Sequence, residues 1–489
     1  MRLFSQLLIL IVALGCAASV ALSAPPACCA EEQAIDNLAF SLHQHEGDVD
    51  GPTLLVVGGI QGDEPGGFNA ASLLVTHYKI KRGNVWIVPN LNFVSIIQQS
   101  RGVYGDLNRK FSFLGPSDPE YPVIEKIKSI ITDERVDIVL NLHDGSGYYR
   151  HTYIDSMRNP RRWGQSVIID QARIHAPFGN LQNLADRVSM RVNNHLYDPE
   201  HEYNVKNTKT RLGDTEMEKT LTYYAINEGK AAFGVEASKS FPTSLRTYYH
   251  LQVLEAFMDI MGIKYSRNFG LDVAEVERTI DADVAVALYD SRIFLDLRNV
   301  RSNLRYVPMK KNARLAFAST NPLVTVVGEG GNYDVFYGNR RVTNLHPQYF
   351  DYDAAPDTVS MNVDGRTVDV PMGRRVKVSD FFSVEPREGY RVNVIGFAQD
   401  GVVSECGIRI QQSDFMKHFS LDTDGDVFRV EIYREETNAF SGMVLVDFDA
   451  TSPKPAPNPM PATLSPMRII SQGKHLPSAS GVEDSSASR

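Results

Sequence analysis

Residues 54–67, LLVVGGIQGDEPGG, constrain the fold more than any other stretch of the chain. The apolar run at the start is typical of a buried strand. Glycines then mark a tight turn, and Pro65 stands where a helix running to about Tyr78 is predicted to begin. A strand, turn and helix in this order bring Gln61 and Glu64 to the carboxyl end of the strand, where open α/β sheets bind their ligands.

A second apolar strand is predicted over residues 136–142, and it ends directly before His143. Gln61, Glu64 and His143 would supply two neutral ligands and one carboxylate. With an open fourth position, that set is the composition of a catalytic zinc site. The spacing alone leaves a second interpretation open, because the helix dipole also favours acids at a helix start and glycines are common in turns.

The pattern along the chain predicts one α/β domain followed by two all-β domains. Residues 31–268 alternate strand and helix patterns, which indicates a sheet of mainly parallel strands with helices on both faces. Short β-like segments split by Gly, Asn and Asp follow, and we divide them into domains over residues 269–345 and 346–450. Residues 451–489 are rich in Pro, Ser and Ala, which favours an extended, unfolded tail.

Four motifs carry a resemblance to a known family: residues 58–67, 102–111 (GVYGDLNRKF), 143–145 (HDG) and 236–239 (EASK). Together they resemble the peptidoglycan DL-carboxypeptidases that set helical cell shape, a subfamily of carboxypeptidase A-like zinc peptidases in which Gln replaces the first His ligand. The likeness runs over residues 35–450 with the motifs in the expected order. It implies a zinc-carboxypeptidase-like α/β domain with a mostly parallel mixed sheet, then a barrel-like and an immunoglobulin-like β domain.

The resemblance assigns roles to the residues at these motifs. It implies that Gln61, Glu64 and His143 hold a Zn²⁺ ion. Glu236 ends an apolar strand, where burial raises the pKa of a carboxyl, and the resemblance makes it the catalytic base. Arg101 matches the arginine that stabilises the negative charge developing on the carbonyl oxygen.

A carboxypeptidase must also recognise the free carboxylate at the end of its substrate. The guanidinium of Arg offers a bidentate fork for that group, and the resembled enzymes use an adjacent Asn-Arg pair, matched here by Asn108 and Arg109. The likeness also makes Trp163 and Thr222 candidate substrate-pocket residues.

The implied activity is removal of meso-diaminopimelate from the stem tripeptide of muropeptides, by cleavage of its bond to γ-D-Glu. Two alternatives stay open at this point. One is a deacylase of small N-acyl amino acids, which shares a similar Gly-rich corner. The other is a non-catalytic peptidoglycan-binding scaffold, because Gln61 is an unusual metal ligand.

Composition and the first residues bear on the compartment. A net charge of −9 argues against nucleic acid as a partner. Residues 1–30 combine Arg2, an apolar run and small residues, which is the pattern of an export signal. No later apolar segment is long enough to span a membrane, so we expect the mature protein to be soluble in an exported compartment. The family resemblance implies that this compartment is the periplasm and that the β domains offer surfaces to cell-wall partners.

One further motif is superficially that of a calcium loop. Residues 422–426 read DTDGD, but the glycine comes too early for an EF-hand and no Glu stands at the twelfth position. A hairpin turn is therefore predicted there.

Overall fold

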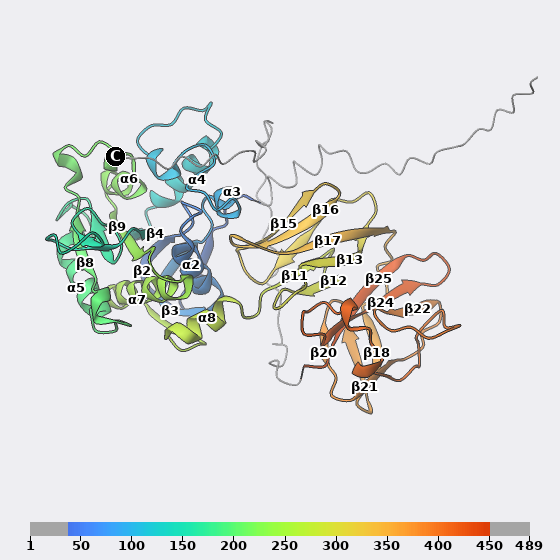
Figure 1. Cartoon of the computed structure of the whole chain (residues 1–489). Helices are drawn as coiled ribbons and strands as arrows, with labels where there is room; N and C mark the ends of the chain where they lie inside the picture. Colours follow the sequence, from blue (N-terminus) through green and yellow to red (C-terminus); the bar gives the residue numbers. More distant parts are fainter. Residues whose placement is uncertain (1–37, 450–489) are drawn as a thin grey trace, which may run out of the picture.

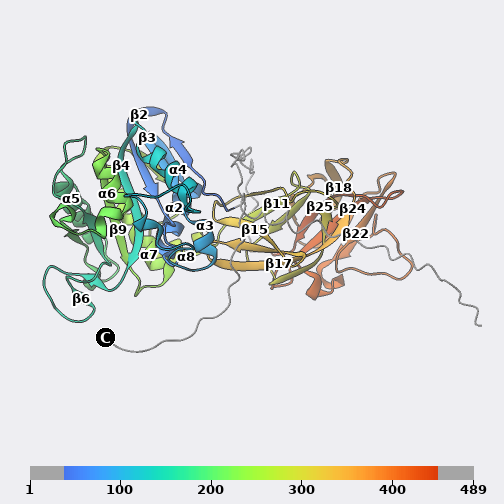
Figure 2. The ribbon, with the colours of Figure 1, turned by 90° about the horizontal axis from the view of Figure 1, so that it is seen from above.

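The computed structural model describes residues 38–449 of the chain. The predicted export signal at residues 1–30 and the predicted tail at residues 451–489 lie outside the described residues. An α/β part comes first and two β-rich parts follow it in a row, so that the middle part lies between the other two (Figures 1 and 2). Between residues 38 and 449, no helix is both long and apolar enough to cross a membrane.

An eight-stranded sheet forms the core of the α/β part, in the order β1-β3-β2-β4-β9-β7-β8, with β10 also paired to β3. The strands are β1 (His43–Glu46), β2 (Val49–Val57), β3 (Tyr78–Val88), β4 (Val136–Gly145), β7 (Ser166–Ile169), β8 (Asn204–Asn207), β9 (Ala231–Ser238) and β10 (Lys264–Arg267). Neighbours among β3, β2, β4 and β9 are parallel, as are β7 and β8. The pairs β1-β3, β10-β3 and β7-β9 are antiparallel. The expected mostly parallel mixed sheet is confirmed.

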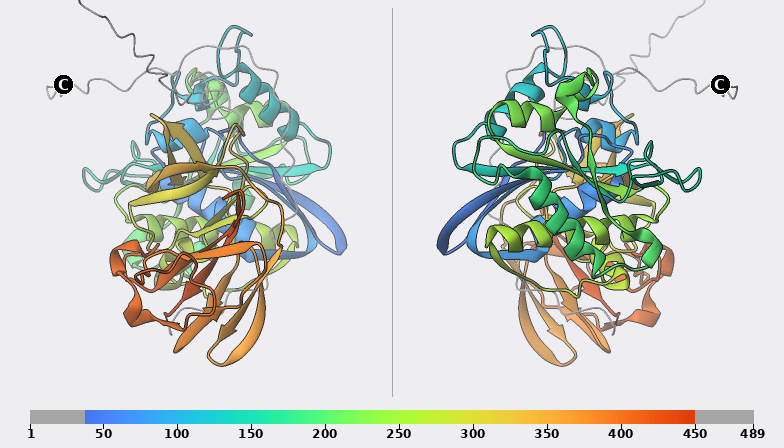
Figure 3. Two further views of the ribbon diagram at one scale, coloured as in Figure 1. Left: turned by 90° about the vertical axis from the view of Figure 1, so that its right-hand side faces the viewer. Right: turned by 90° about the vertical axis from the view of Figure 1, so that its left-hand side faces the viewer.

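Helices cover both faces of this sheet (Figure 3). The main ones are α2 (Pro65–His77), α4 (Tyr121–Ile131), α5 (Leu181–Asn193), α6 (Leu221–Asn227) and α7 (Thr243–Met261), with the short α3 (Phe93–Ile97) following β3. On one face α7 packs against α2 and α5, whereas α4 and α6 lie on the other (Figure 1). Because both faces are covered, residues 53–57 of β2 and almost all of β4 and β9 are buried, as their apolar runs require.

One helix lies where only β structure was expected. Residues 269–345 begin with α8 (Val273–Ile280), which packs on α7. The Asp272 side chain accepts a hydrogen bond from the Glu275 backbone N–H, which caps the helix, and Val276 and Ile280 bury its apolar face. The capping acid and the 3.6-residue apolar spacing favour a helix here, and the β-like segments begin only after it.

The middle part consists of two small sheets. A three-stranded sheet has the order β12-β11-β14, and a four-stranded sheet has the order β13-β17-β16-β15. The strands are β11 (Ala285–Leu288), β12 (Ile293–Asp296), β13 (Asn303–Lys310), β14 (Phe317–Ser319), β15 (Val324–Glu329), β16 (Asn332–Tyr337) and β17 (Arg340–Phe350). β17 runs past residue 345, the limit expected for this domain.

The last part is a pair of four-stranded sheets, ordered β19-β18-β21-β23 and β20-β25-β24-β22. The strands are β18 (Thr358–Val363), β19 (Arg366–Pro371), β20 (Arg375–Lys377), β21 (Phe381–Val384), β22 (Tyr390–Val394), β23 (Ile410–Gln411), β24 (Val427–Arg434) and β25 (Phe440–Asp447). Apolar side chains from both sheets share one buried core, including Phe382 and Phe428, which is the packing of a β sandwich.

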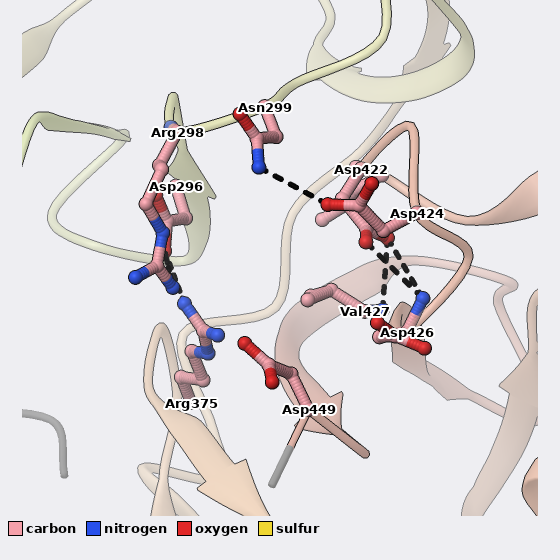
Figure 4. A pocket seen from close by; sticks show the side chains of 10 residues that line it. Asp296, Arg298, Asn299, Arg375, Asp422, Asp424, Asp426, Val427 and Asp449 are labelled. Carbon is pink, nitrogen blue, oxygen red and sulfur yellow. Dashed lines mark hydrogen bonds and ion pairs between the residues drawn. The ribbon is translucent and has the colours of Figure 1, made fainter. Parts of the chain in front are cut away.

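Buried contacts join the three parts. Ser72 in α2 donates a hydrogen bond of 2.9 Å to the Asn321 side chain of the middle part. At the other junction, Arg375 forms ion pairs with Asp296 and with Asp447. This junction borders a hollow of about 380 Å³, and five of its ten lining residues are aspartates (Figure 4).

The DTDGD motif lies at the same hollow and forms a turn before β24, not a hairpin between two strands. Val300 pairs with Asp422 in an isolated antiparallel bridge, so the motif contacts the middle part. The Asp422 carboxylate accepts hydrogen bonds from the backbone N–H groups of Gly425, Asp426 and Val427. This acid therefore closes the turn.

Candidate metal centre

The turn after β2 is tight because glycines let it pass close to other backbone. Gly59 has a positive φ of +69°, which favours glycine. At Gly62 an added Cβ would come within 2.0 Å of the Ser95 backbone, so no other residue fits there. The turn leads Gln61 and Glu64 back over the carboxyl end of the sheet just before α2 begins.

The three predicted metal ligands converge at this edge. The Gln61 Oε1 atom lies 3.1 Å from His143 Nδ1, and the Glu64 Oε2 atom lies 2.9 Å from the same nitrogen. All three residues are buried, with 2%, 3% and 7% of their surface exposed in that order. Tetrahedral zinc bonds of about 2.0–2.1 Å separate neighbouring donor atoms by roughly 3.3 Å, so the side chains present fit a metal ion.

The electrostatics of the trio also favour a cation. Burial by itself lowers the pKa of the His143 imidazole, but the hydrogen bond and the negative charge of Glu64 outweigh burial and raise that pKa. The site therefore attracts positive charge, and a divalent ion held between the same atoms would satisfy that attraction. Residues 38–449 contain no cluster of three His, Cys, Asp or Glu side chains able to hold a metal, so the predicted set depends on the amide oxygen of Gln61 as its third ligand.

Side chains behind the ligands fix their orientation. Gln61 Nε2 donates a hydrogen bond of 2.7 Å to Asp106 Oδ1, which turns the amide oxygen towards His143. The outer oxygen of Glu64, Oε1, lies 3.3 Å from Lys239 Nζ and 3.6 Å from an Arg101 nitrogen. Glu64 is therefore held with its other oxygen, Oε2, towards His143.

Glu236 lies beside the predicted metal ligands. It pairs with His143 in the parallel register of β4 and β9, and only 8% of its surface is exposed. Burial raises the pKa of its carboxyl to about 8, although the nearby His143 opposes the shift. Among the described residues, its Oε2 atom has no hydrogen-bond partner. A buried carboxyl with a free oxygen and a pKa near neutrality is suited to accept and donate a proton.

The residues predicted to bind the substrate carboxylate, and the arginine predicted to stabilise the oxyanion, lie near the predicted ligands. Asn108, in a short 3₁₀ turn over Leu107–Arg109, places its Nδ2 atom 3.3 Å from His143 Nε2. The Arg101 side chain is half exposed and points to Glu64 and Asp106. Arg109 lies 4.0 Å from Asp106, and 31% of its side chain is exposed.

The two candidate pocket residues, Trp163 and Thr222, differ in their relation to the site. An added Cβ on Gly145 would come within 2.6 Å of Glu236 Oε2 and 2.7 Å of Trp163 Cβ, so these two side chains flank that glycine. Thr222, in α6, follows Leu221, whose backbone N–H donates to Asn108 Oδ1, but its own hydroxyl lies 3.2 Å from Thr220 Oγ1. Apart from the Thr222 side chain, the predicted site residues lie around one edge of the sheet.

Comparison with known proteins decides the family. Residues 28–281 match the family model described as "Carboxypeptidase controlling helical cell shape catalytic", and residues 352–449 match the model of the "C-terminal domain of metallo-carboxypeptidase". The chain belongs to this family. It is therefore a metallocarboxypeptidase, and the family favours an enzyme over the scaffold alternative.

Solved structures agree with this assignment. The carboxypeptidase is 40% identical to the apo Cell Shape Determinant protein Csd4 from Helicobacter pylori, with a TM-score of 0.77, over 84% of this chain and 100% of that one. The tripeptide-bound form of that protein matches with a TM-score of 0.76 at the same identity and coverage. Its mDAP-bound form, described as a D,L-carboxypeptidase, matches at 40% identity and a TM-score of 0.77 over 83% of this chain and 99% of that one.

A curated relative has a different activity. N-alpha-acetyl-L-2,4-diaminobutyric acid deacetylase from Halomonas elongata is 38% identical over 104 residues, which are 20% of this chain and 29% of that protein. The match is thus confined to a minor part of both chains.

The sequence patterns did not single out every residue of the carboxypeptidase that shapes the site. Asp106 and Lys239 lie inside the family motifs, but their contacts with Gln61 and Glu64 depend on the folded arrangement. Lys206 places its Nζ atom 3.8 Å over the Trp163 ring and donates to two backbone carbonyls in the loop just before Trp163. Its sequence context, a lysine in a short edge strand, is indistinguishable from that of a surface lysine.

A buried carboxylate also anchors the strand that carries His143. Asp144 accepts hydrogen bonds from the Gly66 backbone at 2.9 Å and from Arg246 at 3.1 Å, and its other oxygen lies 3.0 Å from His250 Nε2. Burial opposes ionisation of Asp144, but His250 and Arg246 hold its pKa below the usual value. The ionised acid therefore links β4 to the start of α2 and to α7.

Proposed function

We propose that this metallocarboxypeptidase is a zinc-dependent D,L-carboxypeptidase of peptidoglycan. It cleaves the bond between γ-D-Glu and meso-diaminopimelate in stem tripeptides and leaves dipeptides. The observation that carries the proposal is the convergence of Gln61 Oε1 and Glu64 Oε2 on His143 Nδ1, at 3.1 and 2.9 Å. The substrate is supported by the structures of the related Csd4 described as bound to tripeptide and to mDAP.

Zinc would be held by Gln61, Glu64 and His143, whose two neutral donors and one carboxylate leave the ion a net charge of +1. When bound, zinc lowers the pKa of a water ligand towards about 7 and polarises the scissile carbonyl. The amide oxygen of Gln61 is a harder donor than imidazole nitrogen, so other divalent ions are expected to compete for the site.

Glu236 moves the proton. In its ionised form, the carboxylate takes a proton from the attacking water, and it later gives that proton to the leaving amine of the departing amino acid. The free Oε2 atom supports this role because it leaves room for the exchange. The reaction is a hydrolysis, so one water is consumed and one carboxylate and one amine are produced.

Asn108 and Arg109 would bind the free carboxylate of the terminal residue, and Arg101 would stabilise the charge that develops on the carbonyl oxygen. Trp163 and Thr222 would form walls of the substrate pocket. The contact between Asn108 and His143, at 3.3 Å, supports placing the carboxylate subsite beside the metal.

The setting of the enzyme follows from the same proposal. An enzyme that trims peptidoglycan acts outside the cytoplasm, and the export-signal pattern of residues 1–30 agrees with a periplasmic location. We also propose that the three parts are separate domains, with the second boundary after β17 and not at residue 345, and that the last two offer surfaces to cell-wall partners.

A digest of defined muropeptides tests the activity. Purified protein supplied with zinc is incubated with the disaccharide tripeptide, and the products are separated by chromatography and mass spectrometry. The expected products are the disaccharide dipeptide and free meso-diaminopimelate, and a chelator should prevent their formation. Unchanged tripeptide in the presence of zinc would overturn the proposal.

A second arm addresses the deacylase alternative, which is favoured by the short match to the Halomonas elongata deacetylase. The same preparation is offered Nα-acetyl-diaminobutyrate, acetyl-aspartate and acetyl-glutamate. Release of acetate from one of these, with no turnover of the muropeptide, would replace the carboxypeptidase proposal by the deacylase.

A further inference from the structure

Glutamine poses a problem as a metal ligand that histidine does not. Its amide carries one oxygen, which donates electron pairs, and one NH₂ group, which cannot. A half turn about the last side-chain bond exchanges the two groups and removes the ligand. A site that uses Gln61 therefore needs a neighbour that distinguishes the two ends of the amide.

Asp106 makes that distinction. Gln61 Nε2 donates to Asp106 Oδ1 at 2.7 Å, while Gln61 Oε1 faces His143 Nδ1 at 3.1 Å. An ionised carboxylate only accepts hydrogen bonds, so it tolerates the NH₂ end of the amide and repels the oxygen end. The reversed amide would place two oxygens against each other.

The acceptor is itself held in place. Asp106 Oδ1 also accepts from the Asn108 backbone N–H at 3.0 Å, which caps the 3₁₀ turn, and its Oδ2 accepts from Arg101 Nε at 3.0 Å. Only 17% of the Asp106 side chain is exposed. One carboxylate thus connects the metal-ligand glutamine to two residues assigned to substrate.

We propose that Asp106 is a positioning residue that holds the Gln61 amide with its oxygen towards the metal. This inference rests on the proposed function, because it concerns the same metal site. Partners that orient metal ligands typically contribute about 10–100-fold to metal affinity, and here the contribution comes from preventing rotation of an amide.

The test measures zinc affinity of the metal-free protein by competition with a chromogenic chelator. Asp106→Ser is the central variant, because serine can still cap the Asn108 N–H but is too short to hold Gln61. Asp63→Ser is the matched control. It removes a carboxylate from the same corner, and Asp63 contacts Lys239 and not the Gln61 amide. Gln61→Ala shows the effect of losing the ligand itself, and thermal melting of each metal-free variant verifies its folding.

Asp106→Ser is expected to lower zinc affinity by about 10–100-fold, approaching Gln61→Ala, with a much smaller loss in Asp63→Ser. Equal losses in the two serine variants would mean that charge alone acts, and wild-type affinity in Asp106→Ser would also overturn the inference. Wild-type affinity in Gln61→Ala would instead refute the metal-ligand assignment of the proposed function, so the two failures are distinguishable.

A second measurement reports the ligand directly. With cobalt(II) in place of zinc, the visible absorption depends on which atoms bind the metal. Asp106→Ser should shift the spectrum towards that of Gln61→Ala, whereas Asp63→Ser should keep the wild-type spectrum. A wild-type spectrum in Asp106→Ser would show that the amide needs no help to stay in place.

Discussion

Glu236 in β9 and Glu431 in β24 are both buried glutamates, with 8% and 2% of their surface exposed. Burial raises the pKa of both carboxyls, that of Glu236 to about 8. They differ in their partners. Glu431 accepts a hydrogen bond of 2.7 Å from Tyr433 and pairs with Arg429 at 3.1 Å. Glu236 Oε2 and Glu431 Oε1 both lack a hydrogen-bond partner among residues 38–449, but Glu431 Oε1 lies in the ion pair with Arg429, whereas Glu236 Oε2 has no ion-pair partner there.

The difference distinguishes a carboxylate that stabilises the structure from one that is available for proton transfer. Arg429 also donates to the backbone carbonyls of Arg305 and Tyr306 in β13, so the Glu431 network ties the last part of the molecule to the middle part. Glu236 ties nothing together through its free oxygen. A buried carboxylate oxygen with neither a hydrogen bond nor an ion pair costs stability, and a catalytic role is one reason for a protein to keep such a group.

Replacing the proposed base should have the largest effect on activity. Glu236→Gln keeps the size of the side chain but cannot exchange a proton, so turnover of the tripeptide should fall by about 10²–10⁴-fold. The melting temperature of the metal-free protein should stay the same or rise, because the variant no longer buries an acid. Glu228→Gln, at an exposed position, is the control for a neutralised glutamate. Full turnover by Glu236→Gln would remove the distinction between the two glutamates.

Breaking the ion pair between Arg429 and Glu431 should have the opposite effect, a loss of stability without a loss of turnover. Arg429→Met leaves the Glu431 carboxyl buried without its cation, which should lower the free energy of unfolding by about 3–5 kcal/mol in urea titrations. Tripeptide turnover per folded molecule should not change. The double variant Arg429→Met with Glu431→Leu removes both charges and should recover most of the loss. If Arg429→Met were as stable as the wild type, the pair would not be what joins the two parts.

Local sequence patterns predicted the parts of the site that follow directly from strand and turn. The apolar runs before Gly58 and before His143 become parallel neighbours, and their carboxyl ends therefore meet. Glu236 could be placed because it ends a third such run, which pairs with the strand of His143. In each case a short stretch of sequence determines the strand, and the pairing of the strand backbones then brings the residues at their ends together.

The remainder depends on contacts between side chains that are distant in sequence. The bond between Gln61 and Asp106 spans 45 residues, and that between Arg429 and Tyr306 spans 123. Nothing in the local spacing indicates that these groups meet. Helix α8 was missed for another reason. Its Asp272 cap is a recognisable local signal, but the β-like segments after it led to a prediction of β structure for the whole region.

The smallest expected effect is the pH dependence that Glu431 contributes. Burial raises its pKa above the ordinary value of 4.5, although Arg429 and Tyr433 oppose the shift. Above that value the unfolded chain releases the proton while the folded protein keeps it, until the folded pKa is passed. The unfolded state then binds fewer protons, so stability falls as pH rises through this window, by at most about 1.4 kcal/mol per pH unit.

Glu431→Gln should remove this contribution. Urea unfolding of the metal-free protein at about pH 5 and about pH 7 should show a smaller decline in the variant than in the wild type. Because the wild type and the Glu431→Gln variant are both metal-free, Glu236 contributes equally to the pH dependence of each protein. An identical decline would mean that Arg429 and Tyr433 fully offset the burial of Glu431. The contrast with Glu236 would then be sharper, because only the glutamate at the predicted metal site would keep a pKa shift from burial that no partner offsets.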